Sequence, residues 1–198
     1  MIAAVVLAAG ASSRMGRPKL LLPVDGPDAL VRLSVARVLA AGLDEVLVVL
    51  GAEADAVAAA LAGLPVRTVL NPRYAEGQST SLRAGVEALR AGTEAVVVAL
   101  ADQPLPEPGL IARLVATFRA SGRPVVVPRY RDGRGTPVLF AAAVFDELRL
   151  VTGDQGGRGV VARDSTRVME VPVDGAMPPD VDTWADYEAI RRAPPSGP

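Results

Sequence analysis

Small residues, hydroxyls and cations gather between Leu7 and Lys19, directly after an apolar run. Small residues let a ligand approach the backbone closely, and exposed N–H groups there can hold phosphate oxygens. Arg14 and Lys19 add charge that can neutralise a polyphosphate. The spacing matches neither the P-loop, GxxxxGK[ST], nor the dinucleotide fingerprint, GxGxxG. We therefore predict an anion cradle of another kind, with a solvated basic surface loop as the alternative.

Three aspartates form a second candidate site. Asp102 follows the apolar run Ala95–Leu100, while Asp180 and Asp182 precede a stretch with helical spacing. Mg²⁺ takes one or two protein carboxylates together with substrate phosphates, so Asp102 and one of the other two could hold it. The alternatives are structural, with Asp102 as a turn residue and Asp182 or Thr183 as the cap of the following helix.

Apolar runs alternate along the chain with stretches of helical spacing. The runs that indicate buried strands are Val5–Leu7, Val46–Leu50, Val66–Leu70, Ala95–Leu100 and Pro124–Val127. The stretches that indicate helices are Ala29–Ala41, Ala54–Leu61, Ser81–Ala91 and Pro108–Ala120. This alternation predicts an α/β fold of the Rossmann-like type, with a mostly parallel sheet flanked by helices. Ligands in such folds lie at the carboxyl ends of strands, and three polar segments directly follow predicted strands: Gly10–Lys19, Asn71–Ser81 and Asp102–Pro104.

The second half of the chain is less regular. It contains the apolar run Val138–Phe140, and we predict a short helix at Val144–Leu150, a strand at Val168–Val173 and a closing helix at Thr183–Arg192. No repeat or linker divides the sequence. We therefore expect one domain over residues 1–192 and a frayed, Pro-rich tail at 193–198.

The composition excludes several classes of protein. The 21 Lys and Arg residues nearly balance the 22 Asp and Glu residues, so we expect no nucleic-acid or membrane partner. The absence of His and Cys removes imidazole chemistry, thiol nucleophiles and the commonest zinc ligands. The apolar run Ile2–Ala9 follows no basic residue, and no run reaches the ~18 residues of a membrane span. These features predict a soluble, cytoplasmic protein.

Three other polar loops are rich in turn-forming residues: Asn71–Ser81, Gly135–Val138 and Gly153–Gly157. Taken alone, each is more simply an ordinary connection between elements. Several arginines in or near these loops could bind an anionic second substrate. They are Arg73, Arg83, Arg129, Arg131, Arg134 and Arg158.

The segment LAAGASSRMGRPKLLLP, at Leu7–Pro23, resembles the signature of the nucleotidyltransferases that make activated sugars, CDP-alcohols and dinucleotide forms of molybdopterin. Within that superfamily the chain most resembles the molybdenum cofactor cytidylyltransferases. Further matches occur in the family's order, at NPRYAEGQSTSLRAG, ADQPL, GTPVLF, GDQGGRGV and DVDTWADYEAI. Two positions depart from the family's pattern, because Thr136 stands where His is frequent and Trp184–Ala185 replaces Pro-Glu.

The resemblance implies roles for individual residues. The residues implied to be catalytic are Arg14, Lys19 and Asp102. Those implied to bind the nucleotide are Leu7, Ala8, Ala9, Gly10, Arg14, Lys19, Gln78 and Ser81, with Ala9 resembling members that use cytidine. Mg²⁺, for which Mn²⁺ can substitute, is expected on Asp102 and Asp182, with Asp180 in reserve. The pterin substrate is expected at Gly135, Thr136, Pro137, Asp154, Gln155, Gly156 and Gly157.

The same resemblance implies transfer of CMP from CTP to the terminal phosphate of molybdopterin, with release of pyrophosphate. The product would be the cytosine dinucleotide form of the molybdenum cofactor, which a molybdenum hydroxylase could receive. A sugar phosphate or an alcohol phosphate is an alternative acceptor. A non-catalytic carrier of the pterin cofactor is a further alternative, although a carrier has no need of both Lys19 and Asp102.

Overall fold

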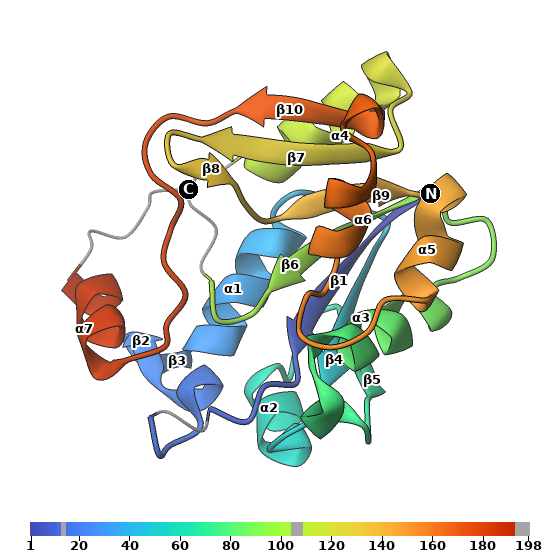
Figure 1. Ribbon diagram of the computed structural model, residues 1–198. Helices are drawn as coiled ribbons and strands as arrows, with labels where there is room; N and C mark the ends of the chain where they lie inside the picture. The colour runs from blue at the N-terminus through green and yellow to red at the C-terminus, as the bar shows by residue number, and fades with distance from the viewer. Residues whose placement is uncertain (13–14, 104–108, 193–198) are drawn as a thin grey trace.

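The computed structural model describes residues 1–12, 15–103 and 109–192. Its strands are β1 (Ile2–Ala8), β2 (Pro23–Asp25), β3 (Asp28–Ala29), β4 (Glu45–Leu50), β5 (Arg67–Leu70), β6 (Ala95–Leu100), β7 (Val125–Tyr130), β8 (Gly133–Arg134), β9 (Val138–Ala141) and β10 (Val168–Pro172). One sheet has the order β10-β7-β9-β6-β1-β4-β5, with β8 paired to β7, and β2 and β3 form a separate pair (Figure 1). Strand β1 is parallel to both of its neighbours, whereas β9 is antiparallel to β6 and β7. The predicted α/β fold with a mostly parallel sheet is confirmed.

Helices cover both faces of the sheet. They are α1 (Leu30–Leu39), α2 (Ala54–Ala60), α3 (Gln78–Glu87), α4 (Leu110–Ser121), α5 (Phe145–Arg149), α6 (Arg158–Arg163) and α7 (Trp184–Arg192), with short 3-10 turns η1 (Lys19–Leu21), η2 (Tyr74–Glu76), η3 (Ala142–Val144) and η4 (Ser165–Arg167). Successive strand side chains point to opposite faces, so Val6 packs in the cluster with α1, α2 and α4, and Val5 packs in the cluster with α3, α5 and α6. None of the helices in these ranges has both the length and the apolar character that a membrane crossing requires.

Several observed bounds differ from the predicted ones. Helix α3 begins at Gln78 rather than Ser81, because Gly77 turns the chain with a φ of 114° and Asp154 accepts a hydrogen bond from the first helical N–H. The predicted helix from Pro108 begins at Leu110, and Pro108 lies outside the described residues. The predicted frayed tail, 193–198, lies outside them as well. Helix α6 and the β2–β3 pair have no counterpart in the sequence-based prediction.

Strand β1 lies at the point where the order of the sheet reverses. The chain leaves β1 for β4 on one side, and β6 later pairs with β1 on the other side. Loops that follow such neighbouring parallel strands diverge and leave a crevice at their carboxyl ends. The cation-rich segment follows β1 and Asp102 follows β6, so both predicted sites lie at this crevice.

Candidate active site

An ion cluster connects three segments that are distant in the sequence. The ammonium of Lys19, in η1, lies 2.7 Å from Asp102 Oδ2 and 2.9 Å from Asp182 Oδ1. The Lys19 side chain is only 10% exposed, so the three charges interact with limited screening by water. The structure thus joins the cation predicted for the anion cradle to the two carboxylates predicted to bind a metal.

Thr183 and Asp186 cap helix α7 reciprocally. The Asp186 carboxylate accepts from the Thr183 N–H at 2.8 Å and from its hydroxyl at 2.7 Å. In return the Asp186 N–H donates to Thr183 Oγ1 at 3.2 Å, which completes a capping box. The sequence left Asp182 and Thr183 as alternative caps, and the structure assigns the cap to Thr183. The Asp182 carboxylate therefore binds Lys19 instead.

The carboxylates near Lys19 influence one another. Burial raises the pKa of Asp180, the charges of Asp102 and Asp182 raise it further, and the charges of Lys19 and Arg158 partly offset the rise. Burial by itself lowers the pKa of Lys19, but its pKa is raised overall because Asp102 and Asp182 stabilise the ammonium. Asp102 and Asp182 thus act on Asp180 at the crevice, and their combined negative charge favours a further cation.

The arrangement of Asp102 and Asp182 fits a magnesium or manganese ion. Such ions are bound through one or two protein carboxylates and substrate phosphates, and they keep several waters. The oxygens of both aspartates already converge on one cation, the Lys19 ammonium. Within the described ranges, no group of three or more acidic, His or Cys side chains is arranged to hold a metal. Substrate phosphates and water would therefore complete the coordination of a metal on this pair.

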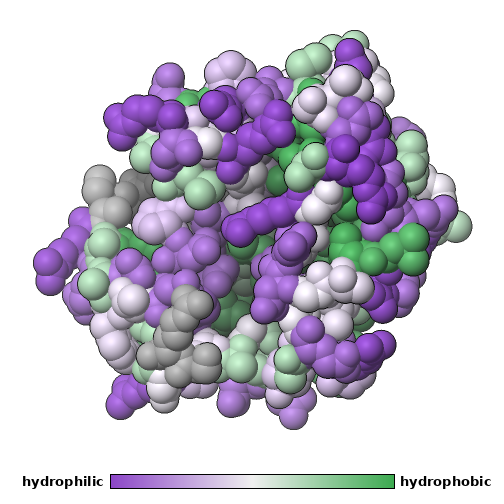
Figure 2. Space-filling view, viewed as in Figure 1, coloured by the Kyte–Doolittle hydropathy of each residue, from purple (hydrophilic) through white to green (hydrophobic). Residues whose placement is uncertain are grey.

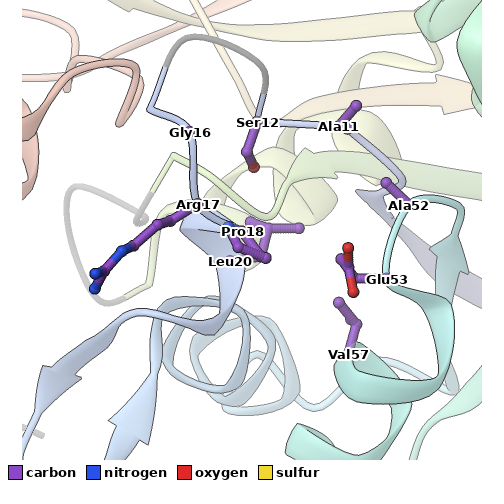
Figure 3. Close-up of a pocket in the computed structure, with 10 residues that line it drawn as sticks. Ala11, Ser12, Gly16, Arg17, Pro18, Leu20, Ala52, Glu53 and Val57 are labelled. Atoms are coloured by element: carbon purple, nitrogen blue, oxygen red, sulfur yellow. The ribbon is translucent and has the colours of Figure 1, made fainter.

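A pocket of about 290 Å³ opens beside the predicted cradle (Figure 3). One wall is the segment after β1, including Gly10, Ser12 and Arg17, and the opposite wall is the start of α2, including Glu53. Ser12 Oγ accepts from the Lys19 N–H at 3.1 Å, which links the pocket wall to the ion cluster. Figure 2 shows the surrounding face, where hydrophilic side chains border a hollow near its middle.

The ends of β1 and β4 approach closely behind this pocket. A Cβ atom added to Gly51 would lie 2.7 Å from both the Cβ and the carbonyl oxygen of Ala9. The Ala52 N–H donates to that same oxygen at 3.2 Å, and Leu7, Ala8 and Ala9 are all buried. The predicted nucleotide segment therefore presents its backbone at the crevice while its side chains pack inside. Arg14, predicted to bind the triphosphate, lies outside the described residues.

The loop Gly153–Gly157 packs against the start of α3. The Gln78 N–H donates to Asp154 Oδ1 at 3.2 Å, and a side chain at Gly156 would collide with the amide oxygen of Gln78. The structure thus brings the predicted nucleotide residue Gln78 together with two predicted pterin residues. Ser81 lies deeper, where it is buried and accepts from Asn71 Nδ2 at 3.0 Å.

The predicted pterin residues Gly135, Thr136 and Pro137 lie elsewhere. Tyr130, at the end of β7, donates its hydroxyl proton to the carbonyl oxygen of Thr136 at 3.1 Å, and Gly135 packs against the Tyr130 ring. Pro137 is buried next to them. The remaining two belong to the loop 153–157, where Gly157 packs against the ring of Phe140 and the carbonyl oxygen of Gln155 accepts from the Arg158 N–H at 3.0 Å. The segment 135–137 therefore belongs to the edge formed by β7 and β8, and the loop 153–157 belongs to the start of α3.

Most of the arginines predicted to bind an anionic substrate are already bonded within the protein. Their contacts are Arg73 with Glu76, Arg129 and Arg134 with Glu170, and Arg83 with the carbonyl oxygen of Val151. Arg158 is placed differently, because it is exposed and its charge acts on Asp180, beside the ion cluster. The broad arginine surface expected from the sequence is therefore reduced by internal pairing.

The residues of the opposite wall of the pocket were not predicted from the sequence. Ala52, Glu53 and Val57 line it, although none of them was singled out. Glu53 has a φ of 54°, which is rare for a side-chain-bearing residue, but backbone angles cannot be read from its type. The available signal was Gly51 at the end of a strand, where a missing side chain permits close approach.

Comparison with known proteins identifies relatives that span most of the chain. Residues 4–168 match the model of a MobA-like NTP transferase domain. The chain is 36% identical over 165 residues to nicotine blue oxidoreductase of Paenarthrobacter nicotinovorans, which spans 79% of each protein. It is 30% identical over 200 residues to the purine catabolism protein PucB of Bacillus subtilis, spanning 96% of this chain and 95% of that one. It is 31% identical over 198 residues to 2-C-methyl-D-erythritol 4-phosphate cytidylyltransferase of Cereibacter sphaeroides, spanning 98% and 78%.

Solved structures give the same result. The crystal structure of Rv0371c from Mycobacterium tuberculosis H37Rv matches with a TM-score of 0.86 and 36% identity, over 97% of this chain and 98% of that one. A complex of Rv0371C with manganese matches with a TM-score of 0.84 and 34% identity, over 98% and 99%. The family match covers the sheet from β1 to the start of β10, including the crevice with Lys19 and Asp102. The chain therefore belongs to the MobA-like NTP transferase family.

Proposed function

We propose that the protein transfers CMP from CTP to the terminal phosphate of molybdopterin or of the molybdenum cofactor and releases pyrophosphate. The observation that carries this proposal is the convergence of Lys19, Asp102 and Asp182 beside the cradle of an NTP transferase domain. The motifs at Gly135–Val138 and Gly153–Val160, which resemble those of the molybdenum cofactor cytidylyltransferases, support the pterin as acceptor. A molybdenum hydroxylase would then receive the dinucleotide product.

The reaction is a substitution at the α-phosphorus of CTP. An oxygen of the acceptor phosphate forms a new P–O bond, and the bond from the α-phosphorus to the bridging oxygen breaks, so its electron pair leaves with pyrophosphate. A phosphate monoester is already ionised near neutral pH, so the enzyme needs no base to activate it. A chain without His can therefore carry out this chemistry through alignment and charge.

The residues of the crevice would supply the charge. Backbone N–H groups after β1 would hold triphosphate oxygens, and the Lys19 ammonium would stabilise the charge that moves onto pyrophosphate. Asp102 and Asp182 would hold a divalent ion, which when bound withdraws charge from the triphosphate. Mg²⁺ is the proposed ion, and the manganese complex of the related Rv0371C supports Mn²⁺ as a substitute.

Cytosine as the base is supported by Ala9 and by the similarity to a cytidylyltransferase of Cereibacter sphaeroides. That relative also favours a second candidate, CMP transfer to an alcohol phosphate, because the likeness spans 98% of this chain. An oxidoreductase activity, which the Paenarthrobacter relative has by name, is less well supported because this sequence holds no GxGxxG fingerprint.

The test is to incubate the purified protein with Mg²⁺, molybdenum cofactor and CTP, GTP or ATP, and to measure pyrophosphate together with the nucleotide recovered on the pterin. Release with CTP that depends on the pterin is the expected result. Release only when the pterin is replaced by 2-C-methyl-D-erythritol 4-phosphate would support the second candidate. Absence of release with every nucleotide and acceptor would contradict both, and direct binding of the pterin would then test the carrier alternative.

A further inference from the structure

One position in the crevice, between Asp102 and Asp182, suits either of two cations: the Lys19 ammonium or a divalent metal ion. The Lys19 ammonium lies 2.7 Å from Asp102 Oδ2 and 2.9 Å from Asp182 Oδ1, so it stands between the two carboxylates that would hold a divalent ion. Two cations at one position repel each other strongly where water screens them poorly. A metal ion on this pair therefore competes with the Lys19 ammonium for its position.

Lys19 also offsets the repulsion between the carboxylates of the free site. Without its charge, Asp102 and Asp182 would face one another across a partly buried crevice, with Asp180 nearby. Like charges in such a place repel strongly because water screens them poorly. The ammonium thus offsets one of the two negative charges until a divalent ion replaces it.

The pocket next to Lys19 offers a place for the displaced ammonium. The backbone of Lys19 is held by Ser12 Oγ at 3.1 Å, and its neighbours Pro18 and Leu20 line the 290 Å³ pocket. The other end of the side chain is a flexible four-carbon stem. Rotation about that stem would carry the charge toward the pocket while the backbone stays in place.

We infer that Lys19 is a displaceable internal counter-ion, which holds the metal pair in the free protein and is released into the phosphate cradle when a divalent ion binds. Metal binding would then prepare the cradle for a triphosphate. The inference rests on the proposed function for the identity of the anion, but the exchange itself involves only the protein and the metal.

Lys19 is the only lysine in the sequence, which makes the exchange directly observable. Protein labelled with ¹³C-lysine gives one set of Lys19 εCH₂ signals in an NMR titration with Mg²⁺, without nucleotide or pterin. We expect a saturable shift of that signal with Mg²⁺ and no such shift for Asp102→Asn. An εCH₂ signal that stays unchanged while Mg²⁺ displaces bound Mn²⁺ from the protein would overturn the inference.

Mn²⁺ affinity, measured from the EPR signal of the free ion, provides a second test. Lys19→Met removes the competing ammonium and should tighten Mn²⁺ binding by at least about fivefold, the low end of typical coupling between linked sites. Arg17→Met is the matched control, because it removes a cation from the same segment that lines the pocket. An equal gain in Arg17→Met would show a general charge effect, and unchanged or weaker binding in Lys19→Met would show that metal and lysine do not compete. Either result would overturn the inference, whereas a failed transferase assay would not affect it.

Discussion

The N–H of Val181 donates a hydrogen bond of 3.0 Å to the carbonyl oxygen of Asp102. Val181 is fully buried between Asp180 and Asp182, so the acidic segment before α7 is anchored to the end of β6 by main chain and by an apolar side chain. The position of the two acidic segments thus does not depend on the charges they carry. Removing one carboxylate should therefore test chemistry rather than folding.

Asp102→Asn should lose about 10²-fold or more in transfer rate, as expected when a preorganised electrostatic group is removed from a reaction centre. The variant should retain the thermal unfolding curve of the natural protein, because Val181 still bonds to the backbone of residue 102. Pyrophosphate release at saturating Mg²⁺ is the measurement, and EDTA should abolish it in the natural protein. Near-normal turnover of the variant would show that Asp102 does not hold the metal.

Thr183→Ala should destabilise the protein by about 1 kcal/mol, the usual cost of losing a helix N-cap. The substitution removes the hydroxyl that exchanges hydrogen bonds with Asp186. Thr183→Ser keeps the hydroxyl and serves as the control, so it should unfold close to the natural midpoint in urea. If alanine and serine variants were equally stable, the capping box would not stabilise α7.

Asp180→Asn should stabilise the protein at pH 7 in the absence of metal. The pKa of Asp180 in the folded protein is raised above 3.8 by burial and by Asp102 and Asp182. The folded state therefore retains the proton to higher pH than the unfolded chain does, and stability falls as pH rises through that folded pKa. Asparagine is neutral and of similar size, so it avoids this loss.

Thermal melts in EDTA would test the effect of Asp180→Asn. The melting temperature of the variant should exceed that of the natural protein at pH 7, and the difference should shrink as the pH approaches 3.8. Asp174→Asn is the control because Asp174 is an exposed acid upstream of the same segment, and surface substitutions usually change stability by less than about 0.5 kcal/mol. A variant less stable than the natural protein at pH 7 would contradict the prediction.

The sequence predicts the ion cluster better than it predicts the pocket. Lys19 and Asp102 could be brought together because each follows an apolar run, and parallel strands end at one edge of a sheet. Asp182 could be predicted as a metal ligand because it forms, with Asp180, an acidic pair before the last helix. Glu53 could not be found in this way, since its place in the pocket depends on the turn after β4 and not on its chemistry.

The direction of strand β9 and the contact between the start of α3 and a distant loop could not be predicted from the sequence either. The apolar run Val138–Phe140 was noted without being assigned to a strand, and an apolar run is the same in either direction, so the antiparallel pairing of β9 was not foreseen. The start of α3 was placed too late because its first N–H binds Asp154, which lies 76 positions further along the chain. Local patterns contain no information about such a partner.

Ala9→Gly should change the choice of nucleotide. The Ala9 methyl group packs where the ends of β1 and β4 meet, so close to Gly51 that a Cβ there would lie 2.7 Å away. Glycine removes that methyl group and frees the backbone next to Gly10. We expect the ratio of kcat/KM for CTP to that for GTP to fall by about tenfold, which corresponds to roughly 1.4 kcal/mol. Ala11→Gly, at an exposed position in the same segment, is the control and should leave the ratio unchanged. If Ala9→Gly also leaves the ratio unchanged, the base is selected by other groups at the crevice.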